Sequence, residues 1–250
     1  MTYAGRVPAS AAAGNISLRC LGRKEAGRTA GRKRMFSKVP WRELFIRAVS
    51  LATRLLFILF GGLRVRGLEN IPQEGPVLIA SNHTSYTDPV GILAVCPRLL
   101  HYMAAAELFD IPVIGTLIKY LQAFPVRRGE NDLQAIAKCR QLLKEGQGVV
   151  IYPEGKITLD GYLGELRDGT VLMALRAKCP VVPVVMLGFD KMLPLNAKFL
   201  HFAYKEIRIG KPLYFADLDP HLSVKERAAL GSAQLRQALL DLGAREKTDI

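Results

Sequence analysis

Short apolar runs alternate with stretches of helical period over most of this chain, beginning after Gly61 and Gly62. Six runs have the length and composition of strands, with turn residues between them: 76–82, 99–105, 123–128, 148–155, 180–187 and 206–215. Helical patterns fall between or after these runs, at 89–96, 112–121, 131–145, 169–177 and 224–242. The alternation predicts an α/β layered fold, in which a central, largely parallel or mixed sheet is flanked by helices.

Residues 41–60 have a different pattern, WRELFIRAVSLATRLLFILF, in which polar side chains recur at offsets of four, three and four. This spacing aligns them as one narrow stripe on a helix, formed by Glu43, Arg47, Ser50 and Arg54. The remaining surface is apolar, so we expect residues 41–63 to hold an amphipathic helix that lies in a membrane interface with its arginines at headgroup level. The alternative is a helix buried against the domain with only its stripe in solvent. No run of about 20 uncharged apolar residues is present, so no transmembrane span is predicted.

Positive charge is concentrated in the first 40 residues, which hold nine Lys and Arg residues and one Glu and so carry +8 of the formal net charge of +13. This acid-poor segment is rich in Ala, Gly, Arg and Ser and has no sustained apolar period, so we expect residues 1–40 to be a basic, disordered tail. The same composition is typical of an organellar transit peptide, and a translation start at Met35 is a third alternative.

The other 210 residues carry a net charge of only +5. A mildly basic surface suits anionic membrane lipids or a phosphorylated substrate at least as well as DNA, so no nucleic-acid partner is expected of the folded part. Nucleic-acid binding through the tail is the alternative, and it would weaken steeply with salt. Acidic runs and C-x-x-C pairs are absent, so neither a metal site nor a disulfide framework is predicted for the four cysteines, Cys20, Cys96, Cys139 and Cys179.

Charged or titratable groups follow three of the apolar runs. His83 follows the first run, Arg127 and Arg128 follow AFPV, and Glu154 follows VVIYP. Ligands of α/β sheets bind outside the carboxyl ends of the strands. We therefore expect these side chains to meet in one crevice.

The stretch SNHTSYTDPV at 81–90 has two interpretations. In the first, Asp88 caps the N–H groups of a helix whose first position is Pro89. In the second, His83 is a general base, and Asp88 orients its ring and stabilises the imidazolium. Side chains five residues apart on an uninterrupted helix are turned by about 140°, so the pair can meet only if His83 lies in the loop before the helix and Asp88 in its first turn.

Two further segments carry groups suited to phosphate. Arg128, beside Arg127, offers bidentate hydrogen bonds that lysine cannot reproduce. After Glu154, Gly155 allows close approach of the backbone to an anion, and Lys156 supplies positive charge. Taken alone, each segment has an ordinary alternative: a solvated basic turn and a Pro-Glu-Gly turn.

Four segments taken in order, NHTSYTD (82–88), AFPVRRG (123–129), YPEGKIT (152–158) and CPVVPV (179–184), resemble the four ordered motifs of the 1-acylglycerol-3-phosphate acyltransferase family and its glycerolipid relatives. By this resemblance, His83 and Asp88 match the H-x4-D pair that activates the acceptor hydroxyl. Arg128 matches the arginine of the second motif, and Glu154 with Gly155 matches the acid-glycine pair of the third. The second and third motifs are implicated in holding the acceptor phosphate.

The fourth motif and two departures complete the comparison with the family. Val182 and Pro183 match the fourth motif, which is associated with the acyl-donor side or with shaping the pocket. The third motif usually continues with Thr and Arg, whereas this chain has Lys156 and Ile157. A lysine common just before the E-L-F segment is also missing, because residues 104–106 are alanines. Lys156 restores some charge at the phosphate site, but not a bidentate donor.

The resemblance implies that residues 64–250 form an acyltransferase domain. It would move a fatty acyl group from an acyl thioester, on coenzyme A or acyl carrier protein, to 1-acylglycerol 3-phosphate and give phosphatidic acid, with no further cofactor. Glycerol 3-phosphate, another lysophospholipid and a hydroxylated amino-acid lipid remain open as acceptors, and a non-catalytic membrane- or lipid-binding protein of the same fold is the alternative from another class. The expected location is a membrane surface, at its cytoplasmic face, with organellar targeting by residues 1–40 as the alternative.

Overall fold

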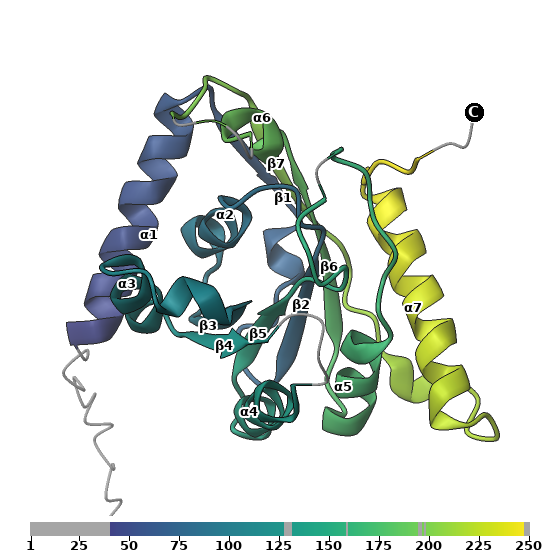
Figure 1. Ribbon diagram of the computed structural model, residues 1–250. Helices are drawn as coiled ribbons and strands as arrows, with labels where there is room; N and C mark the ends of the chain where they lie inside the picture. The colour runs from purple at the N-terminus through teal and green to yellow at the C-terminus, as the bar shows by residue number, and fades with distance from the viewer. Residues whose placement is uncertain (1–40, 128–131, 159, 195–196, 198, 248–250) are drawn as a thin grey trace, which may run out of the picture. The chain divides into compact units, whose positions relative to one another are not determined.

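The computed structural model describes residues 41–127, 132–158, 160–194, 197 and 199–247. The predicted basic tail, residues 1–40, and the predicted phosphate ligand Arg128 therefore lie outside the described residues. Residues 39–250 form one compact unit. Figure 1 shows its layers, with helices on both sides of a central sheet.

The sheet has seven strands: β1 (Leu63–Arg66), β2 (Val77–Ser81), β3 (Leu100–Ala105), β4 (Ala123–Val126), β5 (Gly148–Ile151), β6 (Val181–Leu187) and β7 (Lys205–Ile209). Their order across the sheet is β1-β7-β6-β2-β5-β3-β4. The pair β6 and β7 is antiparallel, and the other neighbours in this order run parallel. The predicted largely parallel or mixed sheet is thus confirmed, and β2 lies at its centre between β5 and β6.

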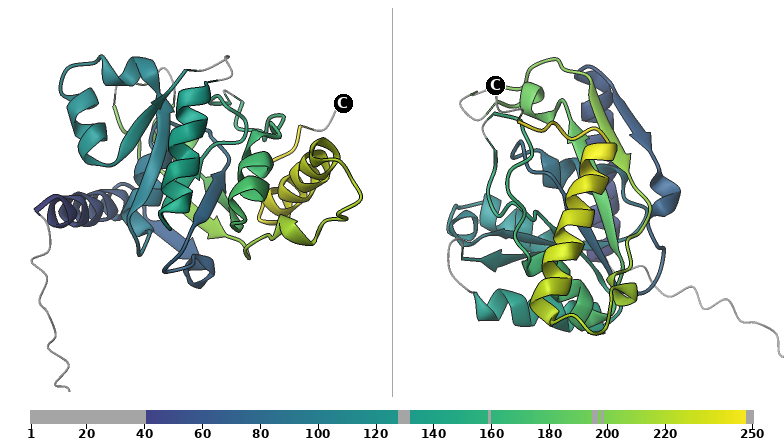
Figure 2. Two further views of the ribbon diagram at one scale, coloured as in Figure 1. Left: turned by 90° about the horizontal axis from the view of Figure 1, so that it is seen from below. Right: turned by 90° about the vertical axis from the view of Figure 1, so that its right-hand side faces the viewer.

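Helices cover both faces of this sheet: α1 (Trp41–Leu59), α2 (Asp88–Val95), α3 (Ile114–Tyr120), α4 (Leu133–Lys144), α5 (Gly169–Ala177), α6 (Phe189–Met192) and α7 (Val224–Asp241). One core cluster joins α1 and α2 to the sheet, and the other joins α4, α5 and α7 to its opposite face. Figure 2 shows α7, in yellow, lying over that second face.

Alternation along the strands divides the core between these two faces. On β2, Val77 and Ile79 pack toward α1 and α2, whereas Leu78 and Ala80 pack toward α4, α5 and α7. All four side chains are fully buried. A strand buried on both faces is apolar at every position, which explains the continuous apolar run read from the sequence here.

Helix α1 docks by one narrow face and exposes the rest. Its buried residues are Ile46, Thr53 and Phe57, and Ser50 Oγ donates a hydrogen bond of 2.9 Å to the carbonyl oxygen of Leu93 in α2. The large apolar side chains on its other sides are exposed: Trp41, Leu44, Phe45, Leu51, Leu55, Leu56, Ile58 and Leu59. The alternative with only the polar stripe in solvent is therefore wrong, because Ser50 of the stripe faces the domain and the broad apolar surface faces outward.

The C-terminal end of α1 is linked to β7 by hydrogen bonds of Lys205. The buried ammonium of Lys205 donates to the carbonyl oxygens of Phe60 and Ala203, both at 2.7 Å, and lies 5.8 Å from the centre of the Phe57 ring. These contacts satisfy a charge that burial would otherwise make costly. They also hold α1 in one orientation on the domain.

The first and last strands of the sheet, β1 and β7, differ from the prediction. The pattern missed β1, whose four residues LRVR alternate between half-buried and exposed positions at the sheet edge. The predicted run 206–215 ends early, at Ile209, where Gly210 and Pro212 follow. Beyond them Leu213 makes only an isolated bridge to Val181, because proline cannot donate to a strand ladder.

Candidate active site

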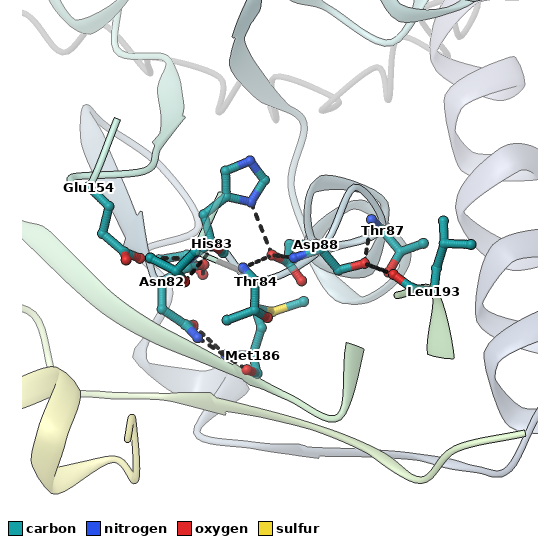
Figure 3. A network of polar contacts seen from close by, with 11 residues as sticks. Asn82, His83, Thr84, Thr87, Asp88, Glu154, Met186 and Leu193 are labelled. Atoms are coloured by element: carbon teal, nitrogen blue, oxygen red, sulfur yellow. Dashed lines mark hydrogen bonds and ion pairs between the residues drawn. The ribbon is translucent and has the colours of Figure 1, made fainter. Parts of the chain in front are cut away.

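The carboxyl ends of β2 and β5 bring the histidine and the glutamate of the sequence motifs together. These two strands are adjacent and parallel, so the segments that follow them leave the sheet at the same edge. The backbone N–H of His83 donates to Glu154 Oε1 at 2.8 Å, and both residues are buried. Figure 3 shows this contact beside the imidazole of His83.

The side chains of His83 and Asp88 form a buried pair, with 3.0 Å between His83 Nδ1 and Asp88 Oδ2. The same carboxylate oxygen accepts the backbone N–H groups of Thr84 at 2.7 Å and Ser85 at 2.8 Å. The exposed fraction is 6% for His83 and 0% for Asp88. Three donors on one oxygen fix the carboxylate, which in turn fixes the orientation of the imidazole ring (Figure 3).

This geometry corrects the capping interpretation. Asp88 is the first residue of α2 and Pro89 the second, with Thr87 as the N-cap. The Asp88 carboxylate does not bond the N–H groups of the helix; it turns back to the loop at Thr84 and Ser85. The helix begins at the Asp-Pro pair, one residue earlier than predicted, and the carboxylate of Asp88 organises the loop that carries His83.

Burial shifts the pKa values of both carboxyl groups. Burial raises the pKa of Asp88, against the opposing effect of its hydrogen bonds with His83, Ser85 and Thr84. Burial likewise raises the pKa of Glu154, although hydrogen bonds from the backbone N–H groups of Gly164 and His83 oppose it. The two carboxyl groups therefore stand in a low-dielectric environment, where an interaction with a charge that develops on His83 is stronger than in water.

Tyr152 forms one wall of the histidine site. Its ring stacks on the imidazole of His83 with the centres 3.9 Å apart and the planes at 19°. Burial, with a smaller contribution from Asp88, raises the pKa of the Tyr152 phenol well above its usual range. The sequence analysis assigned Tyr152 no role, although it is the first residue of the YPEGKIT segment, because nothing in the local pattern indicates a contact with His83.

Asn82 anchors the loop on the other side. Its side-chain Nδ2 donates to the carbonyl oxygen of Met186 at 3.2 Å, and the N–H of Met186 donates to Asn82 Oδ1 at 2.8 Å. This pair of bonds imitates a strand contact and continues the pairing of β2 with β6 past Ser81. Asn82 belongs to the NHTSYTD segment, but no local pattern indicates its partner, which lies 104 residues further along the chain.

The loop after β5 is held by bonds to the same histidine. Thr158 donates to the carbonyl oxygen of His83 from its backbone N–H at 2.8 Å and from its hydroxyl at 3.1 Å. The second oxygen of Glu154, Oε2, accepts the N–H of Gly164 at 2.8 Å. Both backbone groups of His83 are thus bonded to the segment that contains Gly155 and Lys156.

A groove of about 830 Å³ opens beside this loop. Its lining includes Glu154, Lys156 and Thr158, together with Arg167 and Lys247 from more distant segments. Three of these five side chains are cationic. Because Glu154 and Thr158 also bond the backbone of His83, the groove adjoins the segment that carries the histidine.

The remaining predicted site residues lie elsewhere. Val182 and Pro183 are buried in β6, where they pair with Ile79 and Ala80 of β2. Their positions support the sheet beneath the site, and their assignment to the donor side stays a prediction. Arg127, the neighbour of Arg128, is described, and its backbone N–H donates to Asp132 Oδ2 at 2.8 Å.

Known proteins share this sequence and this architecture. The model of the acyltransferase family matches residues 62–187. A 1-acyl-sn-glycerol-3-phosphate acyltransferase of Bacillus subtilis (strain 168) is 35% identical over 193 residues, which are 76% of this chain and 93% of that protein. The chloroplastic 1-acyl-sn-glycerol-3-phosphate acyltransferase BAT2 of Brassica napus is 30% identical over 159 residues, which are 62% of this chain and 46% of that protein.

A solved structure has the same fold. The crystal structure of the 1-acyl-sn-glycerophosphate acyltransferase PlsC from Thermotoga maritima matches with a TM-score of 0.68 and 22% sequence identity, covering 83% of each chain. It supports the arrangement of layers described above. The match to the Bacillus protein covers nearly all of that protein, whereas this chain spans about half the length of the Brassica protein.

Proposed function

We propose a specific reaction for this chain, which belongs to the acyltransferase family and is an O-acyltransferase. In this proposal it transfers a fatty acyl group from an acyl thioester to the free hydroxyl of 1-acylglycerol 3-phosphate, and the product is phosphatidic acid. The acceptor rests on relatives that carry this name in Bacillus and Brassica. The observation that carries the chemistry is the buried His83–Asp88 pair at the carboxyl end of the central strand.

His83 acts as the general base in this proposal. Because Nδ1 faces the carboxylate of Asp88, the proton of the neutral ring is assigned to Nδ1, and Nε2 carries the lone pair. Nε2 removes the proton of the acceptor hydroxyl while the hydroxyl oxygen attacks the thioester carbonyl. The tetrahedral intermediate then collapses with cleavage of the carbon–sulfur bond, and the imidazolium returns the proton to the thiolate. Asp88 stabilises the imidazolium between these steps.

The acyl donor in this proposal is a thioester on coenzyme A or on acyl carrier protein. Direct transfer needs no redox or metal cofactor, because the histidine supplies the base and the thioester already carries a good leaving group. The site needs only to place the hydroxyl and the thioester carbonyl beside Nε2 of His83.

We also propose that the exposed apolar face of α1 lies in a membrane surface. A cluster of exposed apolar residues on and before α3 extends it: Ile111, Val113, Ile114, Leu117 and Tyr120. The two parts touch, because the rings of Phe45 and Tyr120 meet edge to face at 5.9 Å, and Arg42 donates to the carbonyl oxygens of Lys119 and Tyr120. We call these exposed residues of α1 and 111–120 the apolar surface.

The composition of this region favours a lipid occupant. Contiguous exposed apolar patches are uncommon on monomeric soluble proteins and mark interaction sites. Exposed cations stand at its border, among them Arg42, Arg47 and Arg54 of α1, and they suit anionic headgroups. Among the described residues, no helix is both long and apolar enough to cross a membrane. The proposal is therefore one of interfacial binding, which would bring the enzyme to substrates that reside in the bilayer.

A substrate panel tests the proposed reaction. The full-length protein, bound to vesicles of mixed zwitterionic and anionic phospholipid, would be incubated with an acyl-coenzyme A or acyl carrier protein donor. The acceptors would be 1-acylglycerol 3-phosphate, glycerol 3-phosphate, a lysophospholipid with a larger headgroup and a hydroxylated amino-acid lipid. We expect acceptor-dependent thiol release and phosphatidic acid by mass spectrometry with the first acceptor. Thiol release that does not depend on any acceptor, or a different acylated product, would contradict the proposed acceptor.

A further inference from the structure

An arginine from a distant segment lies against the glycine of the third motif. The conformation of Gly155, with φ of +70°, favours glycine, and a β-carbon placed there would lie 3.1 Å from Nε and 3.2 Å from Cζ of Arg167. The guanidinium of Arg167 therefore rests on the Glu154–Gly155 turn itself. Family members usually carry an arginine two residues after this glycine, where this chain has Ile157.

The loop between these residues is folded so that Arg167 returns to the turn. The backbone N–H of Arg167 donates to the carbonyl oxygen of Pro153 at 3.0 Å, and Gly164 donates to Glu154 Oε2 at 2.8 Å. From the far side, Arg236 Nη1 donates to the carbonyl oxygen of Gly164 at 2.9 Å. These bonds position the backbone of residue 167 independently of its side chain.

The guanidinium has donors free for a ligand. Across the described part of the chain, the Arg167 side chain makes no hydrogen bond or ion pair. It lines the groove of about 830 Å³ with Lys156 and Lys247, so three cationic side chains face one space.

Acidic residues of the groove are largely engaged elsewhere. Both oxygens of Glu154 accept backbone N–H groups, from His83 and Gly164. Asp168 accepts the hydroxyl of Ser232 at 2.7 Å, and Asp160 accepts the N–H of Tyr162. These bonds direct carboxylate oxygens toward protein donors, while Glu165, which also lines the groove, has no hydrogen bond or ion pair among the described residues. The side chains of Lys156, Arg167 and Lys247 likewise make none there, so their donors remain available to a ligand.

We infer that Arg167 binds the phosphate of the acceptor, and that it supplies from a separate segment the guanidinium that Ile157 does not provide. The inference rests on the proposed function, since it assumes a phosphate-bearing acceptor. A guanidinium offers two parallel N–H donors to two phosphate oxygens, and Lys156 adds a point charge beside it. The bonds of Glu154 and Thr158 to the backbone of His83 set this phosphate site next to the general base, so the bound headgroup holds the hydroxyl toward Nε2.

Kinetics of Arg167 variants test this assignment on the full-length enzyme. For Arg167→Gln we expect kcat/KM toward 1-acylglycerol 3-phosphate to fall about 10- to 100-fold, mainly through KM, as expected for the loss of a charge-assisted bidentate contact. The kcat/KM of Arg167→Lys should be intermediate, because lysine keeps the charge but lacks the two parallel N–H donors of the guanidinium. Inorganic phosphate and glycerol 3-phosphate should inhibit the wild type competitively and Arg167→Gln much more weakly.

A matched control separates binding from general effects of charge. Arg176→Gln removes an exposed arginine from α5, outside the groove, and should leave KM unchanged. An Arg167→Gln variant with the wild-type KM, or an equal change in Arg176→Gln, would overturn the assignment while leaving the proposed function standing. A wild type that acylates only acceptors without phosphate would overturn the proposed function, and this assignment with it.

Discussion

His83 Nδ1 lies 3.0 Å from Asp88 Oδ2, although five residues on a continuous helix would turn the two side chains about 140° apart. They meet because α2 begins at Asp88, so His83 stands in the loop and Asp88 in the first turn. The Asp-Pro pair thus sets both the helix boundary and the geometry of the His83–Asp88 pair. The sequence allowed Asp88 to be interpreted either as a helix cap or as the partner of His83. In the structure, one position of the Asp88 carboxylate accounts for both the loop at Thr84 and Ser85 and the orientation of the His83 ring.

The first prediction concerns the base itself. His83→Ala removes the group that accepts the hydroxyl proton in the proposed mechanism, so we expect kcat to fall by about 10²- to 10⁴-fold, the usual contribution of general-base catalysis. Vesicle binding should be retained, because the apolar surface is untouched. The variant should remain folded, with a lower midpoint of thermal unfolding, because the substitution removes a buried side chain that pairs with Asp88 and stacks on Tyr152. His221→Ala, at an exposed histidine, is the control and should keep full activity. Wild-type turnover by His83→Ala would contradict the proposed mechanism.

Asp88→Asn should change the pH dependence of stability. Because burial raises the pKa of Asp88 above its ordinary value of 3.8, the folded protein holds this proton more tightly than the unfolded chain does. The contribution of the group to the free energy of unfolding is therefore greatest below that unfolded pKa, and it is lost as pH rises through the folded pKa. Asparagine cannot titrate.

The measurement is urea denaturation of the wild type and Asp88→Asn at several pH values from 4 to neutrality. We expect the free energy of unfolding of the wild type, relative to the variant, to decrease as pH rises, while the variant is deficient in acyl transfer throughout. A relative stability that increases with pH would show that the hydrogen bonds from Thr84, Ser85 and His83 outweigh burial, and would reverse the stated direction of the pKa shift.

Tyr152 should act by positioning the imidazole through its ring, and not through its hydroxyl. Tyr152→Phe keeps the stack on His83 and removes an oxygen that has no partner among the described residues, so turnover should stay close to that of the wild type. Tyr152→Leu removes an aromatic contact worth about 0.5–1.5 kcal/mol and should lower kcat with little change in KM.

Tyr102 provides the matched control for this pair. Tyr102 is buried, whereas Tyr152 is half-buried; the hydroxyl of each lacks a partner among the described residues, but the ring of Tyr102 is not stacked on His83. Tyr102→Leu should therefore reduce stability, measured by thermal unfolding, while the folded fraction keeps its kcat. If both leucine variants lowered kcat equally, the effect of Tyr152 would be one of core packing alone.

The parts of the site that follow local rules could be predicted from the sequence. Apolar runs of strand length placed His83 and Glu154 at strand ends, and parallel strands put such ends at one edge. What local patterns could not provide is strand order. The hydrogen bond from His83 to Glu154 depends on β2 lying beside β5, and the bonds between Asn82 and Met186 depend on β2 lying beside β6.

The position of Arg167 shows a second limit. Its distance from Gly155 along the chain gives no sign of contact, because the loop between them has neither helical nor strand period. The contact exists only because Gly164 and Arg167 bond back to Glu154 and Pro153. The sequence alone shows that position 157 is isoleucine, whereas the arginine that we infer to supply the missing guanidinium can be identified only in the folded chain.

Polar substitutions on the outer face of α1 should weaken membrane binding without affecting the fold. Leu51 and Leu55 are more than half exposed and lie away from the face that contacts α2. Burial of one leucine side chain contributes about 1.5–3 kcal/mol, so Leu51→Gln with Leu55→Gln should reduce partition onto anionic vesicles at least 10-fold. The control is the pair Val224→Gln and Leu230→Gln, two exposed apolar positions on α7, which should sediment like the wild type.

The turn at Val113 provides a test in which stability and membrane binding change in opposite directions. Val113 has φ of 68° and ψ of −54°, and the N–H of Ile114 donates a 2.8 Å hydrogen bond to the carbonyl oxygen of Pro112. These features define a γ-turn, and this conformation is strained for a β-branched residue such as valine. Its side chain is nevertheless 79% exposed, within the apolar surface.

Val113→Gly relieves the strain and should raise the free energy of unfolding by about 1 kcal/mol, yet it removes an apolar contact and should weaken vesicle binding. Co-sedimentation with vesicles and urea denaturation of the same preparation measure the two effects. Val113→Ile keeps a β-branched apolar side chain and should match the wild type in stability, without weaker vesicle binding. Vesicle binding by Val113→Gly equal to that of the wild type would show that this turn does not enter the membrane.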